Sequence, residues 1–342
     1  MNQPEGRDRL KQTPYQDLEA LIDTYLGPDG LLLSSSRDFQ YRGEQHRLAK
    51  TILSCLVNRE SLIAEAGTGI GKTFAYLIPA LTAGVTVVIS TASKTLQDQL
   101  YNRDLPRLAE VMGRPVKVAR LKGRSNYVCA HRLNRALGGQ LGFNMQEQSL
   151  LHQLAEFSRA SPDGDLSGFD PISRHPGLIP TVTSTMENCL GHRCDHISEC
   201  AVVKAREDAL EASIVIVNHH LLCSSLRLLQ DQDVELLPKP QAYIIDEAHS
   251  FLDIASDQFT QTVSSQSLTT LARDLLAAGQ LLAASRADWP GLAAGLERSA
   301  QSLRLAAQAF GLGRYSWPEP SSSSHQGLAS ALSELKDALR KV

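Results

Sequence analysis

The most informative stretch of the sequence is a glycine-rich loop at residues 63–73, which reads IAEAGTGIGKT. A phosphate-binding loop needs backbone N–H groups around the phosphate oxygens, a lysine for the β and γ phosphates and a hydroxyl for Mg²⁺. It also needs a following helix, whose N-terminus favours anions. Ala66 stands where the usual G-x-x-x-x-G-K-[ST] pattern has its first glycine, and alanine keeps the loop if φ is not positive there. The predicted nucleotide-binding residues are Ala66, Gly67, Thr68, Gly69, Ile70, Gly71, Lys72 and Thr73.

A second candidate site follows the apolar run at residues 242–246, where the sequence continues as DEAH. Nucleotide hydrolysis needs an acid near Mg²⁺ and a group that orients water. We expect Asp246 to hold Mg²⁺ through water and Glu247 to polarise the attacking water. We expect His249 to link the nucleotide site to the rest of the protein. An acidic pair after a strand is a weak signal alone, because many helices begin with acids. Together with GKT, and with Lys72 as a further catalytic residue, it predicts an ATPase.

Four of the six cysteines form one pattern, an isolated cysteine followed by C-x4-C-x5-C within residues 189–200. A disulfide framework is not expected in a chain of this size without a secretory signal. Four thiolates can hold zinc or a [4Fe–4S] cluster, and His192 and His196 also allow zinc with three cysteines. The spacing leans toward iron–sulfur, since zinc sites more often use close C-x2–4-C pairs. The predicted ligands are Cys129, Cys189, Cys194 and Cys200.

Residues 114–135 carry seven Lys and Arg and no acid, in a chain of net charge −3. A solvated surface normally mixes both signs, so this stretch predicts a local basic patch. Such a patch binds phosphates without sequence preference, and an aromatic ring within it can stack on a base. The alternative is a basic surface with no partner. The predicted nucleic-acid contacts here are Lys122, Arg124, Tyr127, Arg132 and Arg135.

Alternating strands and helices must position these groups. Apolar periodicity predicts helices, and short β-branched runs predict strands buried on both faces of a parallel sheet. The alternation is typical of an α/β doubly wound fold. The predicted helices are 15–26, 44–58, 72–84 and 93–111, and the predicted strands are 61–64, 85–90, 212–218 and 242–246.

Composition limits the class of protein and the kinds of binding site that the chain can have. The chain is 42% hydrophobic and its net charge of −3 gives no global basic field, so any nucleic-acid site must be local. No run approaches the ~18–20 apolar residues of a membrane span. The polar N-terminus, MNQPEGRDRLKQ, has no hydrophobic core of a signal peptide. These features predict a cytoplasmic protein with no membrane partner.

Considered together, GTGIGKT and DEAH resemble the motifs of superfamily 2 helicases. The cysteine pattern narrows the resemblance to the iron–sulfur DNA helicases of the XPD and DinG type, most closely the bacterial DinG and YoaA type. The resemblance covers about residues 15–260. Its further motifs are YRGEQHRLA (41–49), STASKTLQDQL (90–100), LKGRSNYVC (121–129) and IVIVNHHLL (214–222).

The resemblance implies a RecA-like lobe interrupted by a cluster domain. It implies adenine contacts from Arg42 and Gln45, and it favours [4Fe–4S] over zinc on the four cysteines. Motif Ia would hold DNA backbone through Thr91, Lys94 and Gln97. The implied domains are the first part of the lobe (1–118), the iron–sulfur domain (119–211), the continued lobe (212–250) and an incomplete helical arch-like segment (251–342).

The implied function is ATP- and Mg²⁺-dependent movement on single-stranded DNA with unwinding of forked duplexes. The family suggests 5′→3′ movement, a role in repair or replication restart, and replication or repair proteins as partners. The family's second lobe carries a Q-x-x-G-R-x-x-R motif, which this sequence lacks. We therefore expect a chain truncated before the second motor lobe. The alternative is a non-catalytic DNA-binding and interaction fragment that retains a nucleotide site and a metal cluster.

Overall fold

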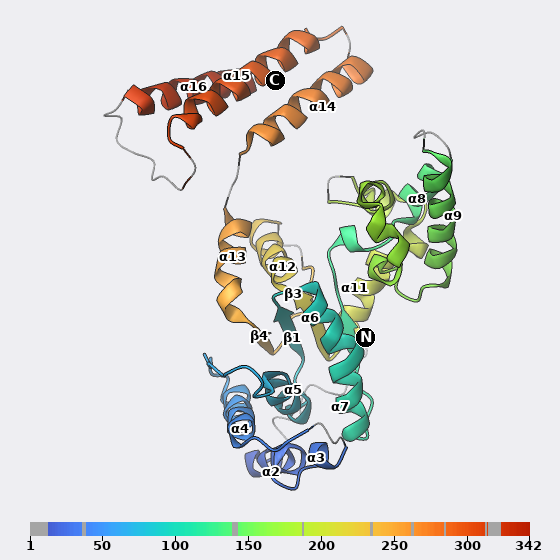
Figure 1. Cartoon of the computed structure of the whole chain (residues 1–342), viewed down its shortest axis with the longest axis vertical. Helices are drawn as coiled ribbons and strands as arrows, with labels where there is room; N and C mark the ends of the chain where they lie inside the picture. Colours follow the sequence, from blue (N-terminus) through green and yellow to red (C-terminus); the bar gives the residue numbers. More distant parts are fainter. Residues whose placement is uncertain are drawn as a thin grey trace. The chain divides into compact units, whose positions relative to one another are not determined.

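The structure of the chain is a computed structural model. It describes residues 13–35, 39–138, 143–186, 188–232, 235–260, 263–283, 285–311, 313 and 323–342. Two compact units make up the chain, Met1–Phe259 and Thr260–Val342 (Figure 1). The candidate site residues all belong to the first unit.

The first unit is built on a four-stranded sheet of order β2-β3-β1-β4, in which every pairing is parallel. The two central strands are β-branched and buried along most of their length, as expected for strands covered on both faces. This confirms the predicted α/β class with a parallel sheet. The strands are β1 (Val87–Thr91), β2 (Val118–Arg120), β3 (Ile214–Asn218) and β4 (Ala242–Ile245).

Helices before β1 cover one end of this unit (Figure 1). Their apolar faces share one core with β1, through side chains such as Leu18, Leu53 and Ile89. Three predicted helices are confirmed here, and Gly84 ends the last of them with a left-handed φ of 65°. The helices are α2 (Tyr15–Leu26), α3 (Leu31–Ser35), α4 (Gly43–Asn58) and α5 (Lys72–Ala83).

Two strand predictions need correction. Residues 61–64 do not form a strand, and the Ile63 side chain is fully exposed. These residues are apolar, but among the described residues no strand pairs with them and β4 remains the edge of the sheet. Conversely, β2 was not predicted, because three residues with one buried side chain carry no readable alternation. Pairing with β3 creates this strand, and the expected domain boundary at residue 118 falls inside it.

The chain after β1 is helical, as predicted for 93–111. It forms α6 (Lys94–Gln99), a π-helical turn (Leu100–Asp104) and α7 (Leu105–Val111). The irregular region that follows builds a small core of its own around Leu133, Leu151 and Val182. Its helices are α8 (Ala130–Leu137), α9 (Met145–Ala160), α10 (Ile179–Val182) and α11 (Ala201–Glu211).

The last elements of the first unit follow β3. They are α12 (His219–Gln232), then β4, then a short 3₁₀ turn (Ala248–Ser250) and α13 (Phe251–Phe259). The second unit contains α14 (Ser265–Ala283), α15 (Trp289–Gln308) and α16 (Ser323–Arg340), packed around residues such as Leu268 and Leu296. The predicted helical character of this segment is confirmed. Among the described helices, none combines the length and apolar character that crossing a membrane requires.

Candidate nucleotide and nucleic-acid sites

The glycine-rich loop is held from behind by α4. Gln45, which is 1% exposed, donates through Nε2 to the carbonyl of Gly71 at 2.8 Å. Gly71 has φ of 85°, and a Cβ there would overlap the Gln45 amide, so this position requires glycine for two reasons. Ala66 is not among the described residues with positive φ, which explains why alanine is tolerated there.

Two residues that were predicted to contact adenine lie beside this loop. Arg42 is partly exposed near Gly71. Gln45 is buried and its amide is committed to the loop carbonyl. The structure therefore gives Gln45 a supporting role instead of an exposed nucleotide contact, because the packing of α4 against α5 turns its side chain inward.

The first residue of α5 meets the acids at the end of β4. Lys72 Nζ lies 3.4 Å from Glu247 Oε1, and both side chains are about one-third exposed. His249 Nδ1 lies 3.4 Å from the other carboxylate oxygen of Glu247 and is mostly exposed. Residues that are far apart in the sequence thus converge at the carboxyl end of a parallel strand, the usual ligand position in such sheets.

The backbone at Glu247 is unusual. Its φ of 55° lies in the left-handed region, which non-glycine residues seldom adopt. Ser250 stabilises this turn by donating to the Glu247 carbonyl from both its main chain, at 3.1 Å, and its hydroxyl, at 3.0 Å. The Glu247 amide donates to Asp246 Oδ1 at 3.0 Å. Strained residues of this kind concentrate at functional sites, where the surrounding structure holds them in place.

Tyr76 is a site residue that the sequence reasoning missed. Its hydroxyl donates to Asp246 Oδ2 at 3.1 Å. Burial, and then the charge of Asp246, raise the pKa of this hydroxyl well above its ordinary value, while a hydrogen bond with Thr73 acts in the opposite direction. Burial likewise raises the pKa of Asp246, against the hydrogen bond from Tyr76. Tyr76 lies one helical turn after Lys72, and a buried tyrosine hydroxyl usually has a partner, so this signal was present in the sequence.

Four predicted DNA contacts are contradicted by their burial: Thr91, Gln97 and Tyr127, described here, and Lys122, described below. The Thr91 hydroxyl donates to the carbonyl of Ser93 at 3.0 Å, and the side chain of Thr91 is 0% exposed. Gln97 is also 0% exposed, and its amide donates to main-chain carbonyls of β3 and of the residue after β2. Tyr127 is 3% exposed and its hydroxyl accepts from the Lys122 amide. Thr91 lies in a central strand of the sheet, and the side chains of Gln97 and Tyr127 are held inward by main-chain partners.

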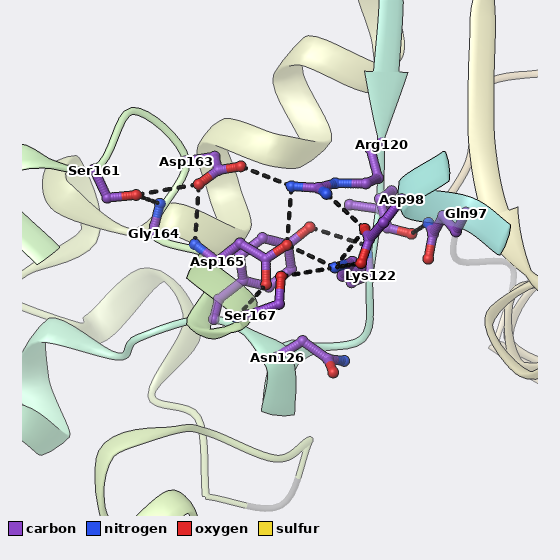
Figure 2. Close-up of polar contacts among 12 residues, drawn as sticks. Gln97, Asp98, Arg120, Lys122, Asn126, Ser161, Asp163, Gly164, Asp165 and Ser167 are labelled. Carbon is purple, nitrogen blue, oxygen red and sulfur yellow. Dashed lines mark hydrogen bonds and ion pairs between the residues drawn. The ribbon is translucent and has the colours of Figure 1, made fainter. Parts of the chain in front are cut away.

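Lys122 belongs to a buried ion cluster. Its side chain is 2% exposed and its Nζ lies 2.8 Å from both Asp98 and Asp165. Arg120 reaches Asp98 at 2.6 Å and Asp165 at 2.9 Å. Figure 2 shows the carboxylates converging on the two cations. The acids come from α6 and from the loop 161–168, so the absence of acids within 114–135 did not mean unpaired cations. The cluster consists of Asp98, Arg120, Lys122, Asp163 and Asp165.

The remaining predicted contacts are at least partly accessible. Lys94, at the start of α6, and Arg135, in α8, are exposed. Arg124 is partly exposed and donates from Nη1 to Cys189 Sγ at 3.1 Å. Arg132 is partly exposed and donates to the Pro180 carbonyl at 2.7 Å. The accessible basic surface is therefore smaller than the sequence suggested.

The four patterned cysteines are partly buried and carry free thiols. Burial raises the pKa of Cys129, and the charges of Cys200, Cys194 and Cys189 raise it further, so each of these three cysteines lies near Cys129. Within the described ranges, no group of three or more His, Cys, Asp or Glu side chains is arranged as a metal site. The donor chemistry fits a four-thiolate centre, with a guanidinium beside one sulfur.

Comparison with known proteins adds independent information. The family model described as DEAD/DEAH box helicase matches residues 44–137. The chain is 41% identical over 280 residues to the ATP-dependent DNA helicase YoaA of Escherichia coli (strain K12), covering 81% of this chain and 44% of that protein. It is 40% identical over 263 residues to YoaA of Haemophilus influenzae (strain ATCC 51907 / DSM 11121 / KW20 / Rd), covering 76% of this chain and 40% of that protein.

A more distant similarity points the same way. The chain is 30% identical over 240 residues to the ATP-dependent DNA helicase DinG of Escherichia coli (strain K12), covering 64% of this chain and 33% of that protein. The chain thus spans less than half the length of each of these relatives. The region that matches the family model, residues 44–137, includes the glycine-rich loop, the segment after β1 and the first patterned cysteine. Residues 44–137 are therefore similar to DEAD/DEAH box helicases, and the chain is similar to part of the ATP-dependent DNA helicases YoaA and DinG.

Proposed function

We propose that this chain binds ATP between the glycine-rich loop and the DEAH turn and couples its hydrolysis to movement on single-stranded DNA. The observation that carries the proposal is the meeting of Lys72 and Glu247 at 3.4 Å, at the end of β4. Three relatives named ATP-dependent DNA helicases support the same reading. Unwinding of forked duplexes, 5′→3′ movement, and a role in repair or replication restart follow from the family resemblance.

The residues divide the work at the nucleotide. Lys72 binds the β and γ phosphates. These phosphates compete with Glu247 for the ammonium group of Lys72. Thr73 and Asp246 offer the hard oxygen ligands that Mg²⁺ prefers, and both lie against the Tyr76 hydroxyl, so the donor set fits. Bound Mg²⁺ would neutralise charge that develops on the phosphates. Glu247, freed from Lys72, orients the attacking water.

The nucleic-acid strand would contact the accessible basic residues. Lys94 at the start of α6 and Arg135 of α8 are exposed, and Arg124 and Arg132 are partly exposed. These side chains give phosphate contacts without base preference, and such binding weakens steeply with added salt. The buried residues among the predicted DNA contacts are excluded from this interface. They are Thr91, Gln97, Lys122 and Tyr127.

We also propose that Cys129, Cys189, Cys194 and Cys200 hold a [4Fe–4S] cluster. The nearness of the other three cysteines to Cys129 and the Arg124 hydrogen bond to Cys189 support this assignment. A bound cluster would cross-link separate segments of a small domain, as metals do in weakly cored folds. Iron and acid-labile sulfide in an anaerobic preparation are the expected result. Zinc without sulfide would contradict the proposal.

The test of the main function is ATP hydrolysis by this chain with and without single-stranded DNA. Lys72→Ala should lower turnover at least about 100-fold, as loss of a key charge-stabilising group does. Lys117→Ala, which removes an exposed lysine outside the site, should leave turnover unchanged. DNA binding without turnover in the wild-type chain would favour the alternative, a non-catalytic binding fragment. Absence of both nucleotide and DNA binding would refute the proposal.

A further inference from the structure

The segment Asn218–His219–His220, at the end of β3, has no role in the function described above. Asn218 Oδ1 accepts from the Leu221 amide at 2.9 Å and so begins α12. This turn sends two adjacent histidines in opposite directions. His219 is 0% exposed, whereas His220 is exposed. A fully buried histidine beside an exposed one calls for an explanation.

His219 contacts the end of β1. Its Nδ1 makes a hydrogen bond with Ser90 Oγ at 2.7 Å. The carbonyl of the same Ser90 accepts from the Asp246 amide at 2.9 Å. Ser90 therefore joins the ends of three neighbouring strands, β3, β1 and β4, at the edge of the sheet where the candidate site lies.

The other side of the His219 ring faces the DEAH turn. The ring of Phe251, which follows this turn, stands at 89° to it with centroids 5.3 Å apart. The main chains of Glu247 and Asp246 lie within hydrogen-bond range of the imidazole. Within the part of the chain that the structure describes, however, Nε2 meets no partner at full hydrogen-bond geometry. The contact of His219 with the DEAH turn is therefore looser than its contact with Ser90, and a small movement of the turn can complete it.

We propose that His219 is a positioning residue that ties the end of β1 to the DEAH turn and thereby couples DNA binding to nucleotide binding. The proposal rests on the function proposed above. Ser90 immediately precedes the segment that leads to Lys94, and Asp246 and Glu247 form the nucleotide side. A shift of either end moves the shared contact, and Nε2 can then complete its hydrogen bond with the main chain of the DEAH turn.

The experiment measures coupling instead of activity. The affinity of the 342-residue chain for a fluorescein-labelled oligo-dT is titrated with and without a saturating non-hydrolysable ATP analogue and Mg²⁺. The ratio of the two dissociation constants should be at least about 5 in the wild type, the lower end of ordinary coupling. In His219→Ala the ratio should fall to within about twofold of 1, while each ligand alone binds with unchanged affinity. His219→Gln, which keeps a donor near the Nε2 position, should recover part of it.

Matched variants isolate the effect. His220→Ala changes the exposed neighbour and should keep the wild-type ratio. Ser90→Ala removes the hydroxyl that contacts His219 Nδ1, so it should lower the ratio of dissociation constants as His219→Ala does. The variant that carries both substitutions should show no further loss. If His219→Ala does not fold, Ser90→Ala carries the test alone. A wild-type ratio retained in the folded contact variants overturns the inference, as does a wild-type ratio of 1. If the wild-type chain binds neither ligand, the proposed function itself fails, and the coupling proposal fails with it.

Discussion

Replacing Lys122 by alanine should destabilise the protein and leave its intrinsic DNA affinity nearly unchanged. The Lys122 side chain is 2% exposed and lies 2.8 Å from carboxylates of Asp98 and Asp165, the latter 4% exposed. Removing one partner of a buried ion pair typically costs about 3–5 kcal/mol, because the other charge stays buried without compensation. Arg120 still contacts both acids, so we expect about 3 kcal/mol, near the lower limit.

The assay is thermal unfolding followed by circular dichroism, together with oligo-dT binding well below the transition. For a unit of this size, 3 kcal/mol corresponds to a fall in Tm of about 6–12 °C. Lys117→Ala is the matched control, since Lys117 pairs with Glu211 at 3.2 Å and both side chains are at least 70% exposed. That variant should lose less than about 1 kcal/mol.

The two interpretations of Lys122 predict opposite results. If Lys122 bound DNA phosphate, as the basic stretch suggested, the alanine variant would keep its Tm, lose affinity for every sequence and show a weaker salt dependence. That outcome would refute the buried ion cluster as the role of this residue.

Three further predictions follow from the site and its supports. Tyr76→Phe removes the donor to Asp246 and should weaken Mg²⁺-dependent nucleotide binding about 10–100-fold, as measured by nucleotide titration with and without Mg²⁺, with only a small change in Tm. Gly71→Ala should lower Tm more than Gly69→Ala: both positions have φ above 80°, but only at Gly71 would a Cβ meet the Gln45 amide. Equal losses in the two variants would contradict the supporting role of Gln45. Burial raises the pKa of Asp165, but hydrogen bonds from Lys122 and Ser167 outweigh it and hold the pKa below its ordinary value of 3.8. A lowered folded pKa gives stability that is complete above about pH 4 and is lost as the pH falls through the folded value, so urea midpoints should drop more steeply below about pH 4 in the wild type than in Asp165→Asn.

Much of the fold could be read directly from local pattern. The central strands β1 and β3 are β-branched runs, and such runs are stable when both faces are covered. The helix α5 begins at Lys72 and ends at Gly84 because the two glycines that flank it adopt left-handed conformations. The phosphate-loop and DEAH sequences also identified which residue types would meet, since their chemistry requires a cation, a hydroxyl and acids at parallel strand ends.

Contacts between segments distant in the sequence decided the strands and the buried side chains that the local pattern did not predict. The apolar run 61–64 reads as a strand, but a strand exists only when another strand pairs with it, and the three-residue β2 exists because β3 does. Burial of Thr91 follows from the position of β1 between β3 and β4, and burial of Gln97 and Tyr127 follows from their contacts with main-chain groups that folding brings to them.

The sequence by itself carried the phosphate-loop and DEAH motifs and the resemblance to helicases, because those motifs are short and their chemistry depends on residues close together along the chain. Tertiary structure alone decided that Lys122 pairs with acids instead of lying exposed, that Tyr76 holds Asp246, and that His219 is buried against Ser90. The physical reason is the same in each case. The energy of a charge or a polar hydrogen depends on the partners that folding brings to it, and in these three cases the partners come from segments distant in the sequence.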